Sequence, residues 1–401
     1  MLASYLLSLI SLLMNVVNVG VIGMGWMGTV HSRSYTSMRD RFHDGGVMPR
    51  LVMCSDNVQE RLNEAQARFG FEEASLDWMD VINHPDIQAV NITSPNFLHR
   101  EMTLAAIAAG KHVMCEKPIG VLPDDVAAVY RAAQAAGVMT FTGLNYRWVP
   151  LVQYAKNLID SGKLGEITNY YGRFFAMYAS DPLGMLNWRF LKEQAGTGAL
   201  GDLMPHAADM AQFLAGPISR VTSTTQTVVT ERPLPVPGRG NHFAVGQAGD
   251  PTGEVTNEDY VGALIEFANG ARGTIEISRA IFGPKVENRF EIYGTKGAIR
   301  WNFETMDELE IYMPDGTTAH DGWTRILSGP ANPFYGRFQP GPGNNMSYDD
   351  LKVIEQHHFL KSIADGEQLE PSFKSAYEFA QVHDAMMRSW ESGAWEEVRE
   401  I

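Results

Sequence analysis

The feature that most constrains this chain is a glycine-rich turn, Gly23-Met24-Gly25-Trp26-Met27-Gly28. The preceding residues 18–22 predict a short buried strand, and residues 26–38 predict a helix. Glycines at this spacing are a weak signal alone and also occur in ordinary turns, but a strand before them and a helix after them indicate a dinucleotide site. Gly23 permits the tight turn, Gly25 lets the backbone approach a pyrophosphate, and Gly28 lets helix and strand pack closely. We therefore expect this turn, with Trp26 and Met27 inside it, to bind the cofactor at the helix N-terminus.

Asp56 ends the next predicted strand, Leu-Val-Met-Cys-Ser. A carboxylate at this position accepts hydrogen bonds from the adenosine ribose and repels a 2′-phosphate. The first basic residue after it is Arg61, so NAD is favoured over NADP. The interval from Gly28 is longer than the usual ~20 residues, which we assign to a predicted loop over residues 39–50. The alternative is a plain surface acid.

Strand and helix patterns alternate as far as residue 143, which predicts a doubly wound parallel sheet of about six strands. After Arg147 the pattern changes to a helix near 151–161 and a series of alternating strands. Asn269-Gly270 between two of them is a strong hairpin signal. We predict an α/β Rossmann domain over residues 14–147 and an α+β domain over 148–401, with a large, mostly antiparallel open sheet, a loop over 328–345 and two closing helices.

Composition narrows the class of protein further. Hydrophobic residues make up 45% of the chain and charged residues 20%, as in globular proteins. The formal net charge of −15 disfavours nucleic acid as a partner. Cys54 and Cys115 lie in apolar runs, which fits a reducing compartment, and we expect a cytoplasmic protein. Residues 1–13 are apolar but lack the basic start of an export signal, so we interpret them as a non-native or disordered extension. No membrane-spanning run follows them.

Three further motifs carry polar groups suited to catalysis. Glu116-Lys117-Pro118 stands at the carboxyl end of a predicted parallel strand, where ligands of open α/β sheets bind. Asp202 and His206, four residues apart, are expected on one helical face with Asp209. Asn145-Tyr146-Arg147 leaves the last strand of the first sheet at the same edge. The alternatives are a surface lysine, a helix-capping aspartate and a structural histidine.

Several segments together resemble one known family, and the similarity extends from Val19 onward. They are GVIGMGWMG, TSPN, AAGKHVMCEKP, GLNYRW, NWRF and GTGALGDLMPHAADM. The family is that of glucose-fructose oxidoreductase, inositol dehydrogenase and the rhizopine catabolism protein (Gfo/Idh/MocA), and the pattern is most similar to its inositol dehydrogenase and levoglucosan dehydrogenase-like members. The resemblance implies a Rossmann domain followed by a domain whose open sheet forms a homodimer or homotetramer interface.

The resemblance also assigns residues by position. It implies Lys117, Asp202 and His206 as the catalytic set. It adds to the cofactor site Thr93, Ser94, Pro95, Asn96, His99, Glu116, Lys117, Trp188 and Arg189. One departure is that the family usually has glycine two residues after the aspartate, where this chain has Met204 followed by Pro205. Proline is tolerated in the first turn of a helix, so a helix that begins near Asp202 remains possible.

We therefore expect an NAD-dependent dehydrogenase of a sugar, anhydrosugar or inositol-like polyol. His206 would remove the hydroxyl proton, Lys117 would stabilise the alkoxide, and Asp202 would orient the pair. The expected substrate-binding residues are Lys117, Asn145, Tyr146, Arg173, Asp202 and His206, with His242 and Tyr335 as further specificity candidates. No cluster with metal-ligand spacing appears, so no metal is expected. The alternatives are a reductase of a non-sugar carbonyl and a non-catalytic NAD-bound sensor.

Overall fold

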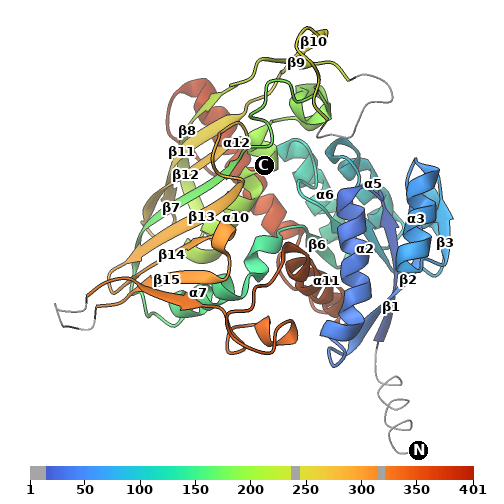
Figure 1. Ribbon diagram of the computed structural model, residues 1–401, viewed down its shortest axis with the longest axis horizontal. Helices are drawn as coiled ribbons and strands as arrows, with labels where there is room; N and C mark the ends of the chain where they lie inside the picture. Colours follow the sequence, from blue (N-terminus) through green and yellow to red (C-terminus); the bar gives the residue numbers. More distant parts are fainter. Residues whose placement is uncertain (1–14, 236–243, 315, 317–320) are drawn as a thin grey trace, which may run out of the picture. The chain divides into compact units, whose positions relative to one another are not determined.

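The computed structural model describes residues 15–235, 244–314, 316 and 321–401 (Figure 1). The chain divides into two compact units. The first holds the chain up to Gly120, Ala128–Asn145 and Met346–Ala376, and the second holds Val121–Ala127, Tyr146–Asn345 and Tyr377–Ile401. Residues 1–13, interpreted above as an extension, and His242, a specificity candidate, lie outside the described residues.

The first unit is built on a six-stranded sheet whose strands are all parallel. Their order is β3-β2-β1-β4-β5-β6, the order of a dinucleotide-binding fold. The strands are β1 (Asn15–Ile22), β2 (Val47–Ser55), β3 (Glu73–Ser75), β4 (Ala89–Ile92), β5 (His112–Cys115) and β6 (Thr140–Thr142). From β1 the chain builds the sheet in both directions, so right-handed crossovers place helices on both faces.

The helices that join these strands follow the predicted order. They are α2 (Trp26–Arg41), α3 (Gln59–Phe69), α4 (Trp78–Asn83), α5 (Asn96–Ala108) and α6 (Pro123–Ala136). The predicted loop over residues 39–50 is wrong at its end, because β2 already begins at Val47. Its first residues pair with Asn15–Val19 of β1, which starts three residues earlier than the apolar pattern indicated.

A late segment of the chain belongs to the first unit. Residues 346–376, which we had assigned to the second domain, group with the Rossmann sheet. Helix α11 (Tyr348–Asp365) packs on α2, β2 and β1. It begins at a capping box in which Ser347 Oγ accepts from the Asp350 backbone and Asp350 Oδ2 accepts from Ser347 N at 2.8 Å. The dinucleotide-binding unit is therefore completed by a helix about 200 residues further along the chain than β6.

The second unit is built on a nine-stranded sheet in the order β16-β15-β14-β13-β7-β12-β11-β8-β17. Its strands are β7 (Ile167–Ala176), β8 (Ile218–Gln226), β11 (Tyr260–Phe267), β12 (Arg272–Ser278), β13 (Val286–Gly294), β14 (Ala298–Asn302), β15 (Glu308–Tyr312), β16 (Thr324–Leu327) and β17 (Glu396–Glu397). Only β7 and β12 pair in parallel. The predicted hairpin is confirmed, because Gly270 adopts a φ of +93° between β11 and β12.

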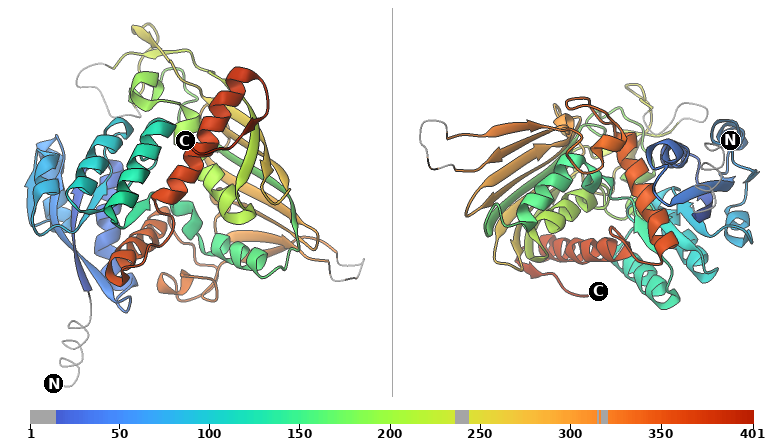
Figure 2. Two further views of the ribbon diagram at one scale, coloured as in Figure 1. Left: turned by 180° about the vertical axis from the view of Figure 1, so that it is seen from behind. Right: turned by 90° about the horizontal axis from the view of Figure 1, so that it is seen from below.

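Helices cover one face of this sheet (Figure 2). Helix α10 (Met204–Ala215) packs on β7, β12 and β13, and α7 (Pro150–Asp160) packs on α10. The remaining elements are α8 (Lys192–Ala195), α9 (Ala199–Asp202), α12 (Phe373–Ser392), β9 (Glu231–Pro233), β10 (Thr252–Glu254), η1 (Asn145–Trp148), η2 (Trp188–Phe190), η3 (Phe303–Thr305) and η4 (Tyr335–Arg337). Within the described ranges, no helix has the length and apolar character needed to cross a membrane.

Candidate active site

The glycine turn of the first unit has the geometry that a pyrophosphate requires. Gly23 adopts a φ of +91°, and a side-chain carbon at Gly28 would lie 1.9 Å from the Gly23 carbonyl oxygen. A side-chain carbon at Gly25 would meet nothing within 4 Å, so the approach to the N-terminus of α2 is open there. The first turn of α2 has no acidic residue and no side-chain cap, which leaves its N–H groups to an anionic ligand.

Asp56 stands beside this turn at the carboxyl end of β2. Its Oδ2 accepts from Met24 N at 2.7 Å and its Oδ1 accepts from Val58 N at 2.9 Å. Arg61 lies next to it, with Nη1 3.3 Å from Oδ1. The two backbone bonds hold the carboxylate against the turn, and the half-exposed guanidinium of Arg61 lies beside it.

The Thr93-Ser94-Pro95-Asn96 segment links the end of β4 to the start of α5. Thr93 Oγ1 donates to the Gly23 carbonyl oxygen at 2.6 Å, which ties this segment to the glycine turn. His99 is buried in α5, and its ring nitrogens lie 2.7 Å from the Pro118 carbonyl oxygen and 2.8 Å from that of Ser94. Burial lowers the pKa of His99, so the neutral ring donates to one carbonyl at a time. The structure places this histidine between the two turns.

Lys117 and Asn145 follow the carboxyl ends of the neighbouring strands β5 and β6. Ligands of open parallel sheets bind at this edge. Asn145 is wholly buried, and neither atom of its side-chain amide has a hydrogen-bond partner among the described residues. A buried amide of this kind normally finds a partner, so Asn145 is suited to a polar group of a bound ligand. Glu116, beside Lys117, is buried in contacts developed below.

In the second unit, Asp202 and His206 do not lie on one continuous helix. Helix α9 ends at Asp202, and α10 begins at Met204 after Leu203. Because Leu203 keeps a right-handed helical backbone (φ −100°, ψ −37°), the shared face of Asp202 and His206 stays a prediction, but the single helix is interrupted. The physical reason is Pro205, which stands in the first turn of α10 and has no N–H to continue the ladder from α9. His206 is buried, with its ring edge-on to Tyr146 at 4.7 Å between centroids and 5.9 Å from Phe174.

Asp202 has a partner that the sequence did not indicate. Tyr178, just after β7, donates its hydroxyl to Asp202 Oδ2 at 2.7 Å. Burial of its hydroxyl group, together with the charge of Asp202, holds the pKa of Tyr178 well above its usual range, so the phenol remains a donor although the residue as a whole is partly exposed. The only sequence signal for it is an aromatic residue at the carboxyl end of a strand.

The loop that carries Tyr178 is held by two buried arginines. Arg232 donates to the carbonyl oxygen of Ala179, and the backbone carbonyl oxygen of Arg279 accepts from Ala179 N at 2.9 Å. The Arg279 side chain donates through Nη1 to the Arg189 carbonyl oxygen at 3.0 Å. Their guanidinium carbons lie 4.1 and 4.7 Å from the Phe190 ring centroid. The same scaffold therefore supports η2, where the Arg189 guanidinium stacks on Trp188 at 4.2 Å.

Other candidates have structural partners. Asp209 binds Arg147 of η1 with both carboxylate oxygens. Arg173 on β7 donates to Glu287 on β13 at 2.7 Å. Tyr335 is wholly buried and donates to the Gly341 carbonyl oxygen at 3.0 Å, so its hydroxyl stabilises its own loop. Tyr146 remains in contact with His206 and also packs edge-on against Phe303.

The fold and the glycine turn define a dinucleotide-binding protein, and the comparisons with known proteins show that it is an NAD-binding oxidoreductase. Residues 17–144 match the oxidoreductase family with an NAD-binding Rossmann fold, and residues 152–300 match the GFO/IDH/MocA C-terminal domain. The chain belongs to this GFO/IDH/MocA family. This confirms the family predicted from the sequence motifs.

Two relatives and one solved structure show how far the similarity extends. Levoglucosan dehydrogenase of Pseudarthrobacter phenanthrenivorans is 38% identical over 384 residues, which cover 96% of this chain and 98% of that protein. Inositol 2-dehydrogenase of Rhizobium meliloti is 26% identical over 376 residues, which cover 93% of this chain and 96% of that protein. The structure of levoglucosan dehydrogenase with NADH and levoglucosan has a TM-score of 0.90 at 36% identity, and the match covers 96% of this chain and all of that one (100%).

Proposed function

We propose that this chain is an NAD-dependent dehydrogenase that oxidises a hydroxyl group of an anhydrosugar, sugar or inositol-like polyol. The observation that carries the proposal is the combination, in one NAD-binding chain, of a lysine after β5 with an aspartate and a histidine where α9 meets α10. The similarity to levoglucosan dehydrogenase over 96% of the chain supports an anhydrosugar or a similar polyol as the substrate.

His206 is the proposed general base. An imidazole takes up a proton near neutral pH, which suits removal of a hydroxyl proton. Its ring is buried against Tyr146 and Phe174, and these contacts restrict its orientation. Bound NAD would supply the hydride acceptor. The role left to the chain is to orient the hydroxyl group and to remove its proton.

Lys117 is the proposed stabiliser of the alkoxide. Its ammonium would donate a hydrogen bond to the reacting oxygen and offset the negative charge that develops there. Asp202 would orient the substrate and the base, and Tyr178 would fix the Asp202 carboxylate through the bond at 2.7 Å. Asn145, with its buried amide, would bind a further polar group of the ligand.

The test is a screen for NADH formation, followed by its absorbance, with levoglucosan, inositols, other polyols and simple secondary alcohols, each with NAD and with NADP. We expect turnover with NAD and a cyclic polyhydroxylated substrate. Turnover only with a non-sugar carbonyl and a reduced cofactor would refute this proposal and favour a reductase.

We also propose a cytoplasmic homo-oligomer that associates through the helix-free side of the nine-stranded sheet. Two observations support it: both cysteines are free and buried, and Tyr171 and Leu264 on this sheet are exposed. Large exposed apolar residues on a sheet suit an interface with a second copy. Light scattering should show a dimer or tetramer that Leu264→Lys disrupts, and a monomeric wild type would contradict this.

A further inference from the structure

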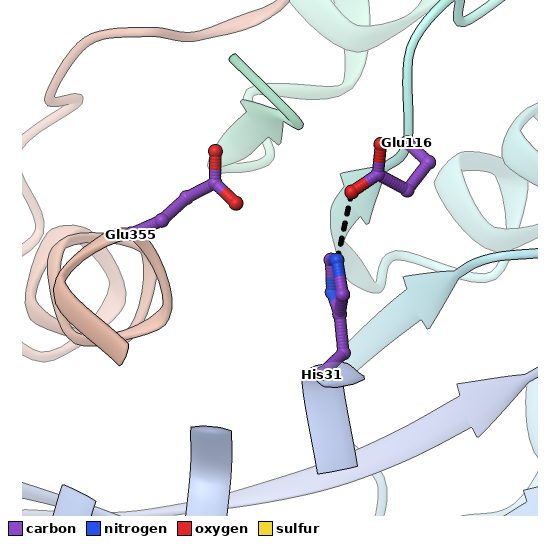
Figure 3. Close-up of side chains that lie close together, drawn as sticks. All are labelled: His31, Glu116 and Glu355. Carbon is purple, nitrogen blue, oxygen red and sulfur yellow. Dashed lines mark hydrogen bonds and ion pairs between the residues drawn. The ribbon is translucent and has the colours of Figure 1, made fainter. Parts of the chain in front are cut away.

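A buried polar cluster lies beneath the Glu116-Lys117-Pro118 turn of the first unit. His31 projects from α2, Glu355 from α11, and Glu116 from the end of β5 toward the same point (Figure 3). His31 Nε2 lies 2.7 Å from Glu116 Oε1. Lys352, one turn before Glu355 on α11, donates to Glu116 Oε1 at 2.5 Å and to Glu355 Oε2 at 2.8 Å. Two carboxylates, one ammonium and one imidazole thus share a buried site.

The histidine of this cluster has a defined tautomer. Nε2 faces Glu116 at 2.7 Å, and an ionised carboxylate only accepts, so the proton of the neutral ring is on Nε2. Nδ1 is then the acceptor for a side-chain amide, and the nitrogens of Asn91 and Gln356 lie 2.8 and 2.6 Å from it. Burial, with the charge of Lys352, lowers the pKa of His31 and keeps it neutral. His31 therefore acts as a directional donor, and the cation of the cluster is Lys352.

His31, Glu116 and Glu355 are residues that could ligate a metal ion, but the ammonium of Lys352 already contacts both carboxylates. Burial alone would raise the pKa of Glu116, yet Lys352 and His31 hold it well below the usual range. Burial alone would lower the pKa of Lys352, yet Glu116 and Glu355 raise it. The Lys352 ammonium therefore occupies the position between the two carboxylates that a metal ion would take.

Glu116 connects this cluster to the turn that carries Lys117. Its Oε2 accepts from the Lys117 backbone N–H at 3.3 Å. Gly143, after β6, makes room for the carboxylate, because a side-chain carbon there would lie 2.4 Å from Glu116 Oε2. The carboxylate is therefore bound on one oxygen by α2 and α11 and on the other by the turn itself.

We propose that Lys352 is a positioning residue for Lys117: its buried ammonium and the His31 ring hold Glu116 in place, and Glu116 holds the backbone from which Lys117 projects. The inference rests on the proposed function of Lys117. According to this inference, α11, a helix near the C-terminal end of the sequence, helps to fix the position of Lys117 in the active site. A small displacement of a catalytic group lowers the rate strongly, whereas the affinity for the substrate changes less.

The main test compares Lys352→Met with the wild type in kcat, KM, pH profile, thermal melting and NADH binding. Without the ammonium, Glu116 and Glu355 become two adjacent buried anions, and one of them binds a proton. We expect kcat to fall about 10- to 100-fold, with KM nearly unchanged. We also expect kcat to fall as the pH is lowered from about 8 to about 5, because a protonated Glu116 no longer accepts hydrogen bonds from His31 and from the turn.

Among the described residues, the titratable groups that face Glu116 are His31 on α2, His99 on α5, Tyr348, Lys352 and Glu355 on α11, and its neighbours Cys115 and Lys117. Tyr35 on α2 faces Glu355. In the wild type Glu116 stays ionised throughout the assay range, so no acid-side loss arises from it. Lys361→Met is the matched control, because Lys361 lies on the same helix but pairs with Asp365 in solvent at 2.6 Å. It should leave kcat and the pH profile unchanged.

A second variant covers the case in which Lys352→Met does not fold. Lys352→Met/Glu355→Gln removes one cation and one anion together, and it should fold with the same loss of kcat. Glu355→Gln alone leaves Lys352 on Glu116 and should keep kcat within about threefold of the wild type. A lower melting temperature with wild-type kcat and pH profile, in either Lys352 variant, would overturn the proposal.

The proposed function and the positioning role of Lys352 can fail separately. A wild type that oxidises no sugar or polyol refutes the proposed function, whatever the variants do. Hydrogen exchange followed by mass spectrometry then still tests the positioning role without a substrate. Exchange in residues 113–121 should be faster in Lys352→Met than in Lys361→Met, and equal exchange would overturn the inference.

Discussion

The hydrogen bond between Tyr178 and Asp202 allows a quantitative prediction for Tyr178→Phe. The variant removes one donor to a carboxylate and leaves the ring in place. A hydrogen bond to a charged group contributes about 1.5–3 kcal/mol. Tyr178 is 37% exposed, so water replaces part of this contribution. We therefore expect a loss of about 1–1.5 kcal/mol, which corresponds to roughly a tenfold decrease in kcat/KM.

The assay is steady-state NADH formation with the substrate found in the screen, together with NADH binding measured by fluorescence. Tyr171→Phe is the matched control, because Tyr171 is an exposed tyrosine on β7 and packs edge-on against Tyr293. Tyr178→Phe should lower kcat/KM, leave NADH binding unchanged and lower the melting temperature by a few degrees at most. Equal kcat/KM in Tyr178→Phe and Tyr171→Phe would refute the role given to this bond.

Three further predictions concern the cofactor turn and a buried histidine. Asp56→Ala should lower kcat/KM with NAD about tenfold and raise kcat/KM with NADP, because Arg61, 3.3 Å from Asp56, then faces the 2′-phosphate. An unchanged ratio of kcat/KM with NAD to kcat/KM with NADP in initial-rate assays would contradict this. Gly28→Ala should destabilise the fold by about 1–3 kcal/mol, because its side chain would lie 1.9 Å from the Gly23 oxygen. Gly25→Ala should keep the melting temperature and weaken NADH binding, because its side chain would meet nothing within 4 Å. Equal melting temperatures for the two variants would contradict this description of the turn. Burial lowers the pKa of His383 to about 4, so the stability it contributes is present above the unfolded pKa near 6.5 and is lost as the pH falls toward 4. Urea unfolding at pH 7 and 4.5 should therefore show a larger loss in the wild type than in His383→Gln, by up to about 3 kcal/mol, and parallel losses would argue against it.

Local patterns predicted the first sheet well. The glycine turn, the strand at His112–Cys115 and the helix at Pro123–Ala136 each follow from apolar periodicity and from the residues that begin or end an element. The prediction failed where contacts between distant segments decide the structure. The extra residues of β2 are strand because β1 pairs with them, although Pro49 and Arg50 read as a loop.

The sequence allowed the types of residue in the candidate site to be predicted, but not their contacts or their positions in space. Pro205 was visible in the sequence as a departure, but only the structure shows that it separates α9 from α10 at Leu203. Lys352 is 236 residues from Glu116, and no periodicity relates the two. Tyr178, which contacts Asp202, likewise stands on a loop bound by the Arg232 side chain and the Arg279 backbone, and neither arginine is near it in sequence. Partners of this kind are set by tertiary packing.

The central claim is that this NAD-binding chain oxidises a sugar or polyol with Lys117 at the reacting oxygen. The most direct test measures NADH formation from levoglucosan and inositols by the wild type, Lys117→Met and the control Lys361→Met. We predict turnover by the wild type and the control, and a loss of about 10²–10³-fold in kcat for Lys117→Met with NADH binding retained. Unchanged turnover in Lys117→Met would contradict the account.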